Sequence, residues 1–242
     1  MIIKRYFGTL SVFVVLLLMW HALHRFTGDE LASPLATAAK LYTMLGEGSF
    51  WANVAETSYA FVLAFVIAAL GGVSLGVVLG LSRLSAVVAE PLLINLYSIP
   101  KVTLYPLVLL CFGLGISAKV AFGVMHGMIP ITIFTMNAIR QMKPVYLRSS
   151  KIMRLSPIQT AWTVVLPAIL PEVLSGLRLG FSLTLLGVLI GEMFASRRGL
   201  GFLITSAMNL GDTETIMAIA SLLTVFALTT NGLLVVLSRQ GR

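Results

Sequence analysis

The sequence contains very few cysteines, histidines and acidic residues. Of its 242 residues, 1 is Cys, 3 are His and 9 are Asp or Glu. A lone Cys111 excludes an internal disulfide framework and a cysteine-rich metal site. Scattered histidines and so few carboxylates supply no paired acid–base or metal-ligand set. The sequence therefore predicts no catalytic site and no metal site.

Charged residues of both signs are also scarce, at 11%, whereas 58% of the residues are hydrophobic and the mean hydropathy is +0.98. Soluble domains contain about 25% charged and about 45–50% apolar residues. A soluble fold of this length could not bury so much apolar surface. We therefore expect an integral membrane protein, in which the net charge of +8 reflects basic loops and not nucleic-acid binding.

Long apolar runs predict the number of membrane spans. A spanning helix needs about 20 mostly apolar residues, and no barrel-like strand alternation is present, which favours a helical bundle. The first run is expected to be retained, because no small-x-small cleavage pattern follows it. The predicted fold class is all-α, a polytopic membrane bundle of about six spans, at residues 7–23, 59–81, 92–114, 118–139, 169–194 and 215–237.

The distribution of charge orients these spans. With the N-terminus in the cytoplasm, the cytoplasmic segments hold Lys4, Arg5, Arg83, Arg140, Lys143, Arg148, Lys151, Arg154, Arg239 and Arg242. The opposite side then holds Arg25, Lys40, Lys119, Arg197 and Arg198 together with Asp29, Glu30, Glu47, Glu56, Asp212 and Glu214. This is the positive-inside pattern, and it places both termini in the cytoplasm.

Local patterns predict two further features outside the spans. Ser33-Pro34 begins a helical apolar pattern in the external segment 27–57, so we expect a short helix at the membrane surface, with Tyr42 and Trp51 as interfacial anchors. Small residues recur every four positions in the second and fifth spans, which lets helix backbones approach closely in lipid. These predicted packing residues are Gly72, Gly76, Gly80, Gly176 and Gly180.

The loop between the fourth and fifth spans is basic and rich in proline. Ser156-Pro157-Ile158-Gln159 has the pattern of a capping box with proline at the first helical position. We expect a helix from there to Val165, ended by Leu166-Pro167, and a second helix over 144–153. The apolar side chains of this loop need a surface to bury against, which indicates docking on a partner, while a plain positive-inside loop remains the alternative.

The same loop resembles the cytoplasmic signature of permeases in binding-protein-dependent ABC importers. That signature is Glu-Ala-Ala, three residues, Gly, nine residues, then Ile-x-Leu-Pro. Here 164–167 matches its end, while Arg154 stands at the Gly position and 148–150 at Glu-Ala-Ala. The spacing is kept and the front half departs from the pattern. The resemblance implies an ATPase-coupling helix formed by Arg148, Ser149, Ser150, Lys151, Met153, Arg154, Leu155, Ser156 and Pro157.

Four other stretches resemble permeases of the nitrate, sulfonate and taurine group. They occur in the expected order and are ETSYAFVLAFVIAALGGVSLGVVLGLSR, YSIPKVTLYPLVLLCFGLG, LPAILPEVLSGLRLG and EMFASRRGLGFLI. The resemblance implies the type I ABC importer permease fold. It divides the chain into an N-terminal helix and external amphipathic segment (1–53) and a transport core (54–242) with its coupling loop at about 144–167.

The resemblance also implies partners and a location. We expect a multi-pass protein of the bacterial inner membrane, with a second permease copy or close homologue, two ATPase subunits and an extracytoplasmic binding protein. The chain lacks a Gly-x-x-x-x-Gly-Lys-Ser/Thr pattern. It is therefore expected to bind no cofactor itself, and the ATPase partners would use ATP and Mg. The implied substrate is a small anion such as a sulfonate, taurine or nitrate; a pyrimidine thiamine precursor is the alternative.

Polar residues at membrane depth are the predicted path residues, since they are costly there. They are Ser98, Lys101, His126 and Glu192. Lys101 follows Pro100, and it either attracts an anion or marks a helix break. His126 is either a packing residue or a transport ligand. We expect Glu192 to pair with Arg197 or Arg198 and hold the turn at 199–201.

Two other function classes compete with this interpretation. A secondary transporter would require coupling carboxylates at mid-membrane and often inverted repeats, and we identify neither in the sequence. A membrane-embedded enzyme would require clustered catalytic groups. An importer permease is therefore the preferred function.

Overall fold

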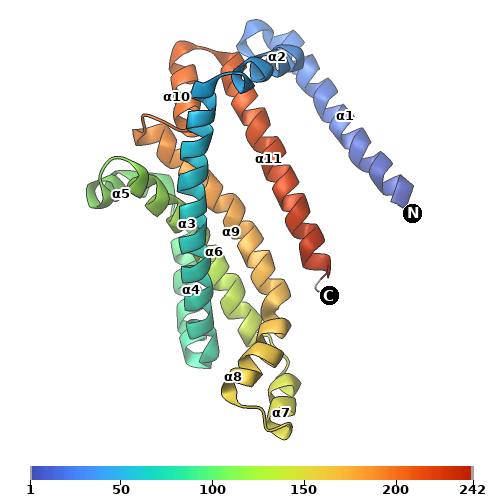
Figure 1. The fold of residues 1–242 in the computed structure, drawn as a ribbon, viewed down its shortest axis with the longest axis vertical. Coiled ribbons are helices and arrows are strands. Elements are labelled where there is room, and N and C mark those ends of the chain that lie inside the picture. Colours follow the sequence, from blue (N-terminus) through green and yellow to red (C-terminus); the bar gives the residue numbers. More distant parts are fainter. Residues whose placement is uncertain (1, 241–242) are drawn as a thin grey trace.

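The computed structural model describes the chain from residue 2 to residue 240, with side chains for 11–233 except 13, 29, 157 and 195. Every regular element in this range is helical, which confirms the all-α fold class (Figure 1). The α-helices are α1 (Ile2–Thr27), α2 (Pro34–Leu45), α3 (Gly48–Leu81), α4 (Arg83–Ser98), α5 (Tyr105–Phe112), α6 (Ile116–Arg140), α7 (Pro144–Ile152), α8 (Pro157–Thr160), α9 (Leu166–Ala195), α10 (Leu200–Leu210) and α11 (Thr213–Gln240).

Helix α6 is the centre of the bundle and packs along both α3 and α9. Glycines make this close approach possible. A Cβ added to Gly76 of α3 would lie 2.5 Å from Cβ of Thr135, and one added to Gly180 of α9 would lie 2.5 Å from the side chain of Ile131. Both neighbours belong to α6, so the two glycine stripes face the same central helix.

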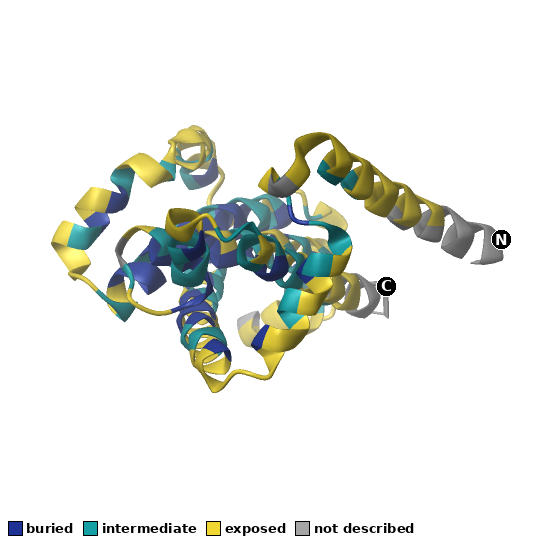
Figure 2. Cartoon of the chain, turned by 90° about the horizontal axis from the view of Figure 1, so that it is seen from above, coloured by how far each residue is buried: buried dark blue, intermediate teal, exposed yellow. Residues whose placement is uncertain are grey.

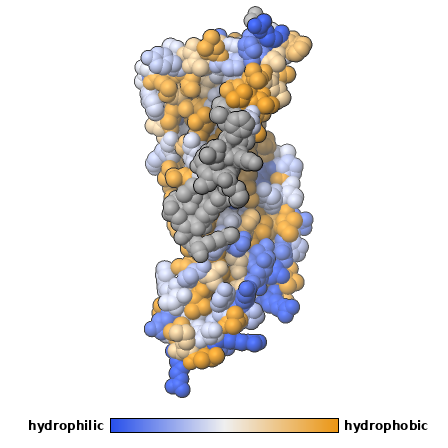
Figure 3. All heavy atoms as spheres, turned by 90° about the vertical axis from the view of Figure 1, so that its right-hand side faces the viewer, coloured by the Kyte–Doolittle hydropathy of each residue, from blue (hydrophilic) through white to orange (hydrophobic). Residues whose placement is uncertain are grey.

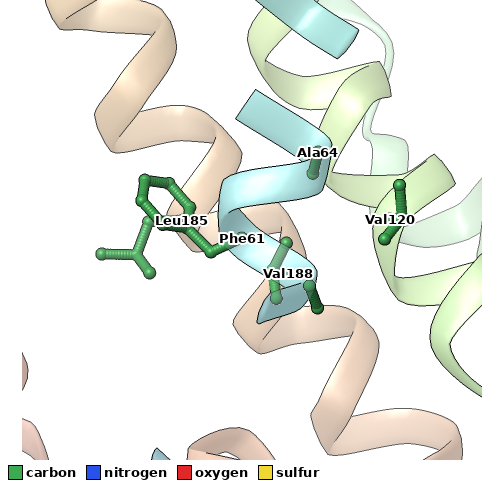
Figure 4. Close-up of a cluster of buried hydrophobic side chains, with 6 residues drawn as sticks. Phe61, Ala64, Val120, Leu185 and Val188 are labelled. Atoms are coloured by element: carbon green, nitrogen blue, oxygen red, sulfur yellow. The ribbon is translucent and has the colours of Figure 1, made fainter. Parts of the chain in front are cut away.

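A buried apolar cluster joins these three helices (Figure 4). Phe61 and Ala64 come from α3, Val120 from α6, and Leu185 and Val188 from α9. Seen from above, buried residues gather inside the bundle and exposed residues cover its outward faces (Figure 2). Because each side chain touches a neighbour on another helix, α3, α6 and α9 form one packed unit.

Four helices are long and apolar enough to span a membrane: Gly48–Leu81, Ile116–Arg140, Ile158–Phe194 and Thr213–Leu233. A fifth candidate is the pair formed by α4 and α5, which are bent by 83° at their junction. The predicted third span, 92–114, is therefore broken, at the position where Pro100 allowed a break. Pro100 has no backbone N–H and restricts the residue before it, and the chain leaves α4 at Ile99.

The helices before the core partly match the prediction. The predicted first span, 7–23, lies partly outside the described side chains, which leave out residues 7–10 and 13. The described part of α1, Val14–Thr27, is an apolar helix shorter than a full membrane span. The predicted start of α2 is confirmed: the Ser33 hydroxyl accepts a 3.1 Å hydrogen bond from the Ala36 amide. Trp51, however, belongs to α3, which begins at Gly48 and crosses the predicted boundary at 53–54. The division into two domains stays a prediction.

The segment after α8 corrects another expectation. Leu166-Pro167 does not end the helix; instead residues Ala161–Val165 form a π-helix that runs directly into α9. Proline cannot donate to the carbonyl four residues earlier and clashes with it. The wider π turn, in which the Leu166 amide bonds to the Ala161 carbonyl, accommodates Pro167 without a break. Residues Ile158–Phe194 therefore form one continuous helix.

Candidate functional site

Helices α7 and α8 form a projection at one end of the bundle, and we call residues 144–165 the α7–α8 projection (Figure 1). Its first helix ends in a Schellman motif. The Leu155 amide bonds to the Ser150 carbonyl at 3.0 Å, and the Arg154 amide bonds to the Lys151 carbonyl at 3.1 Å. These bonds satisfy carbonyls that the end of a helix otherwise leaves unpaired.

The Schellman motif requires a left-handed residue, and here that residue is Arg154, with φ of 52°. Among the described residues it is the only non-glycine with positive φ. Glycine is the usual residue in this conformation because it has no Cβ to clash. The family signature places Gly at this same position, so the chain keeps the backbone turn although the residue has changed.

The second helix of the projection begins with the predicted capping box. The Gln159 amide donates to the Ser156 hydroxyl at 3.2 Å, and the Ser156 amide donates to the Gln159 side-chain oxygen at 2.9 Å. This local prediction is confirmed. Pro157 follows at the first helical position, and its side chain lies outside the described set.

The surface of the projection combines basic and apolar side chains. Arg148, Lys151 and Arg154 are exposed. The exposed apolar side chains are Ile152 (82%), Met153 (69%), Ile158 (74%) and Trp162 (68%). Ser149 and Ser156 are also exposed and Leu155 is half-buried. Ser150 is buried, and its hydroxyl donates to the Leu147 carbonyl at 2.9 Å. All nine predicted coupling residues thus lie in the α7–α8 projection, but the Ser150 side chain is buried.

A buried polar cluster lies at the opposite end of the bundle. Glu192 on α9 is fully buried, and its carboxylate accepts hydrogen bonds from the Thr57 hydroxyl on α3 at 2.8 Å and from the Gly201 amide at 3.0 Å. The Thr57 hydroxyl in turn accepts from the Leu200 amide at 2.8 Å. We call Thr57, Lys119, Glu192 and the 199–201 turn the polar clamp, because together they join α3, α6, α9 and α10.

Lys119 on α6 supplies the cation of the polar clamp. Its Nζ lies 3.6 Å from Glu192 and 3.1 Å from Glu56, and it donates to the Arg198 carbonyl at 3.0 Å. The prediction that Glu192 holds the 199–201 turn is therefore supported by the Gly201 contact. Its predicted partner was wrong: Lys119 pairs with Glu192, whereas the Arg197 and Arg198 side chains are exposed.

The other predicted path residues lie elsewhere. Lys101 is half-buried at the α4–α5 bend, where its Nζ donates to the Tyr97 carbonyl at 2.9 Å and lies 4.9 Å from the Tyr97 ring centre. Ser98 is exposed and donates to the Ile94 carbonyl. His126 is buried inside the bundle, with Nδ1 at 2.9 Å from the Phe122 carbonyl.

These four positions are not joined by direct polar contacts. Within residues 11–233, no hydrogen bond or ion pair joins any two of Ser98, Lys101, His126 and Glu192. Lys101 stabilises the carboxyl end of α4, where a cation favours the helix dipole. His126 has the contacts of a packing residue. The helix break at Pro100 is present. A helix break was one of the two alternatives that the sequence analysis gave for Lys101.

Sequence reasoning missed Thr57, and it gave no role to Lys119, Glu172 or Arg178. Glu172 and Arg178 both lie in α9, with Glu172 exposed near the start of the predicted span 169–194, so it is not a mid-membrane carboxylate. Arg178 stood within the quoted LPAILPEVLSGLRLG stretch. The signal for both residues was available: an ionisable side chain within an apolar run is a functional candidate by default.

Known relatives match most of the chain. The taurine transport system permease protein of Escherichia coli strain K12 is 27% identical over 91% of this chain and 82% of its own length. The riboflavin transport system permease protein of Chloroflexus aurantiacus is 31% identical, covering 89% and 82%. The nitrate import permease protein of Leptolyngbya laminosa is 26% identical, covering 90% and 81%.

A family model also matches the region that contains the glycine stripes, the α7–α8 projection and α9. It covers residues 72–240 and describes the inner membrane component of binding-protein-dependent transport systems. The named relatives are permease proteins of ABC importers, which are transport subunits and not enzymes. The chain therefore belongs to the family of binding-protein-dependent transport system inner membrane components, and it is a multi-pass permease of the ABC importer class.

Proposed function

We propose that the chain forms half of the translocation path of an importer for a small oxyanion, and that the α7–α8 projection docks on an ATPase subunit. The surface of the α7–α8 projection is the observation that supports docking. Exposed apolar side chains at 152, 153, 158 and 162 stand beside exposed basic residues on a capped, compact element. Large apolar side chains that stay exposed together on one element favour the binding of a protein partner.

The proposed orientation follows from the same charges. The α7–α8 projection carries Arg148, Lys151 and Arg154 and no acidic residue, whereas the opposite end combines Arg197 and Arg198 with acidic residues such as Asp212 and Glu214. Positive residues favour the cytoplasmic side, so the projection is cytoplasmic, as are both termini. The opposite end then faces the binding protein that delivers the solute.

The stoichiometry of the importer is also part of the proposal. Two copies of this chain, or this chain and a close homologue, line one path and bind two ATPase subunits, which use ATP and Mg. The four or five spans of the described residues provide one half of such a path. Native mass spectrometry of the purified complex tests this stoichiometry, and a complex with a single permease chain would contradict it.

Substrate class is proposed from the relatives. Those named for taurine, nitrate, aliphatic sulfonates and bicarbonate carry small oxyanions or a zwitterion with an oxyanion group. A pyrimidine thiamine precursor remains the second candidate, because one relative is named for formylaminopyrimidine. Lys101 at the α4–α5 bend is the proposed anion-attracting residue, and uptake should weaken in Lys101→Ala while its membrane abundance stays unchanged.

Crosslinking tests the docking surface. In a Cys111→Ser background, Ile152→Cys places a thiol on the exposed surface, and Ser150→Cys places one in the buried control position two residues away. We expect a nucleotide-dependent crosslink between position 152 and the ATPase, and none from position 150. Absence of any crosslink from 152 and from a second exposed position, Ile158, would contradict docking here.

A further inference from the structure

The α7–α8 projection is basic, and its own chain does not neutralise it. It carries Arg148, Lys151 and Arg154, and no Asp or Glu occurs in the sequence between Glu90 and Glu172. Among the described side chains, none of these three bases makes a hydrogen bond or an ion pair, and Glu90 is already paired with a base at the end of α6. The projection therefore presents three exposed cations without an internal counter-charge.

The projection also stands beyond the depth that lipid covers. Ile158–Phe194 is one continuous helix whose apolar run ends before Arg197 and Arg198. Trp162 lies about 48 Å from Phe194 along this helix, at about 1.5 Å per residue. A hydrocarbon core of about 30 Å that begins at Phe194 and one headgroup layer of about 5–8 Å end well short of this position. A helix tilt of about 20° shortens the distance by only about 3 Å, so Trp162 stands clear of the bilayer.

Arg154 is retained at a cost to the stability of its own chain. It occupies the left-handed position of the Schellman motif, with φ of 52°, where glycine is more favourable. The positive-inside rule favours a base anywhere in this loop, so topology does not explain a base at the strained position. Backbone strain that a protein retains is concentrated at sites that bind or react. The position of Arg154 therefore indicates a contact outside this chain.

The surface around Arg154 has the composition of a protein interface. Hydrophilic and hydrophobic residues lie side by side at the lower end of the molecule, where the projection is located (Figure 3). Met153 and Trp162 are exposed apolar side chains, and Arg148 and Arg154 are exposed bases. Aromatic residues, Met and Arg are enriched in protein interfaces. A base that a partner covers needs an anion from that partner, because an unpaired charge is costly to bury.

We infer that the α7–α8 projection docks on an acidic surface of the ATPase subunit, whose carboxylates pair with Arg148 and Arg154 around an apolar centre at Met153 and Trp162. The inference rests on the proposed function and deepens it, because it names the chemistry of the ATPase surface. The family signature has Glu where this chain has Arg148, so the charge at this position is reversed. An ATPase surface that is basic opposite Arg148 would be repelled.

Titration of the permease with its ATPase subunit tests the inference. The full-length permease is placed in phosphatidylcholine nanodiscs, which carry no net charge. The dissociation constant (Kd) of the ATPase subunit, purified from the same importer, is measured by surface plasmon resonance without nucleotide. Because salt screens charge pairs at an interface, raising the salt concentration from about 0.1 M to about 0.5 M should raise the Kd about tenfold.

Charge reversal on the projection should weaken binding strongly. Arg148→Glu places a carboxylate opposite the acidic surface of the ATPase and should raise the Kd at least about 30-fold. Arg83→Glu is the matched control, because Arg83 is also exposed but lies at the start of α4, outside the projection. The control makes the same change in net charge and should alter the Kd less than about twofold.

Arg154 gives the sharper test, because its two expected effects have opposite signs. Arg154→Gly relieves the positive φ and should raise the melting temperature of the permease, yet it removes a charge and should raise the Kd about threefold to tenfold. Arg154→Lys keeps the charge and should bind within about twofold of the original chain. A residue with only a structural role would not weaken binding when its replacement stabilises the fold.

Three results would overturn the inference: a Kd that neither salt nor Arg148→Glu changes, equally tight binding by Arg154→Gly, or charge effects that appear only in phosphatidylglycerol nanodiscs. The last result would assign the bases to lipid headgroups. The proposed docking is judged separately, by the crosslink from position 152. An intact crosslink with a Kd that is independent of charge would overturn the acidic ATPase surface alone.

Discussion

The polar clamp makes a quantitative prediction about stability. Glu192→Ala removes a fully buried carboxylate that accepts from Thr57 and Gly201 and pairs with Lys119. Lys119, whose side chain is 3% exposed, then keeps only Glu56 and a backbone carbonyl. Removing one partner of a buried ion pair costs about 3–5 kcal/mol. At about 2–4 °C per kcal/mol for a chain of this size, the apparent melting temperature should fall by about 6–20 °C.

The measurement is the melting temperature of the importer complex in nanodiscs, with a double-mutant cycle. Glu192→Gln leaves Lys119 with Glu56 as its one acidic partner, and Lys119→Met leaves Glu192 without a cation, whereas the double variant removes both charges of the pair. We expect a coupling free energy of about 1–3 kcal/mol between them. Glu56→Gln is the control, since Glu56 is 30% exposed and should cost less than about 1 kcal/mol. Additive effects of Glu192→Gln and Lys119→Met would refute the pairing.

Three further predictions concern the rest of the chain. Gly76→Ala should destabilise by about 1–3 kcal/mol through overpacking against α6, whereas Gly232→Ala, with nothing within 4 Å, should be neutral or stabilising in the same melting assay. Arg154→Gly should stabilise by up to about 1 kcal/mol by relieving its positive φ, and Arg154→Val should destabilise; equal melting temperatures would contradict the strain. Hydrogen bonds from Thr215, and then Lys40, lower the pKa of Asp212. The contribution of Asp212 to stability is therefore complete at pH values above its unfolded pKa of about 3.9. It is lost as pH falls through the lowered pKa of the folded state. Asp212→Asn should flatten the acid dependence of melting below pH 4, and an unchanged acid profile would contradict this.

Local features could be predicted from the sequence because their determinants are adjacent. The capping box at Ser156 and Gln159 involves residues three apart, and its two hydrogen bonds are those the pattern requires. The start of α2 at Ser33 is similar. The glycine stripes predicted close helix contacts from their spacing alone, although the sequence did not indicate that both stripes face α6.

Features that depend on distant segments could not be predicted in the same way. Lys119 and Glu192 are 73 positions apart, and nothing local favours Lys119 over Arg197 as the partner of Glu192. The angle of 83° at the α4–α5 junction depends on packing, while Pro100 indicated only that a break was allowed. The π turn before Pro167 is a third case, because proline more often ends a helix than widens it.

The two ends of the bundle are connected through the same helices. The α7–α8 projection lies between the end of α6 and the start of α9, and the polar clamp ties the other ends of α6 and α9 to α3 and α10. Glycine contacts and the apolar cluster fill the length between them. In the proposed importer, a displacement of the projection by the ATPase therefore moves α3, α6 and α9 together, as packed helices shift and do not bend.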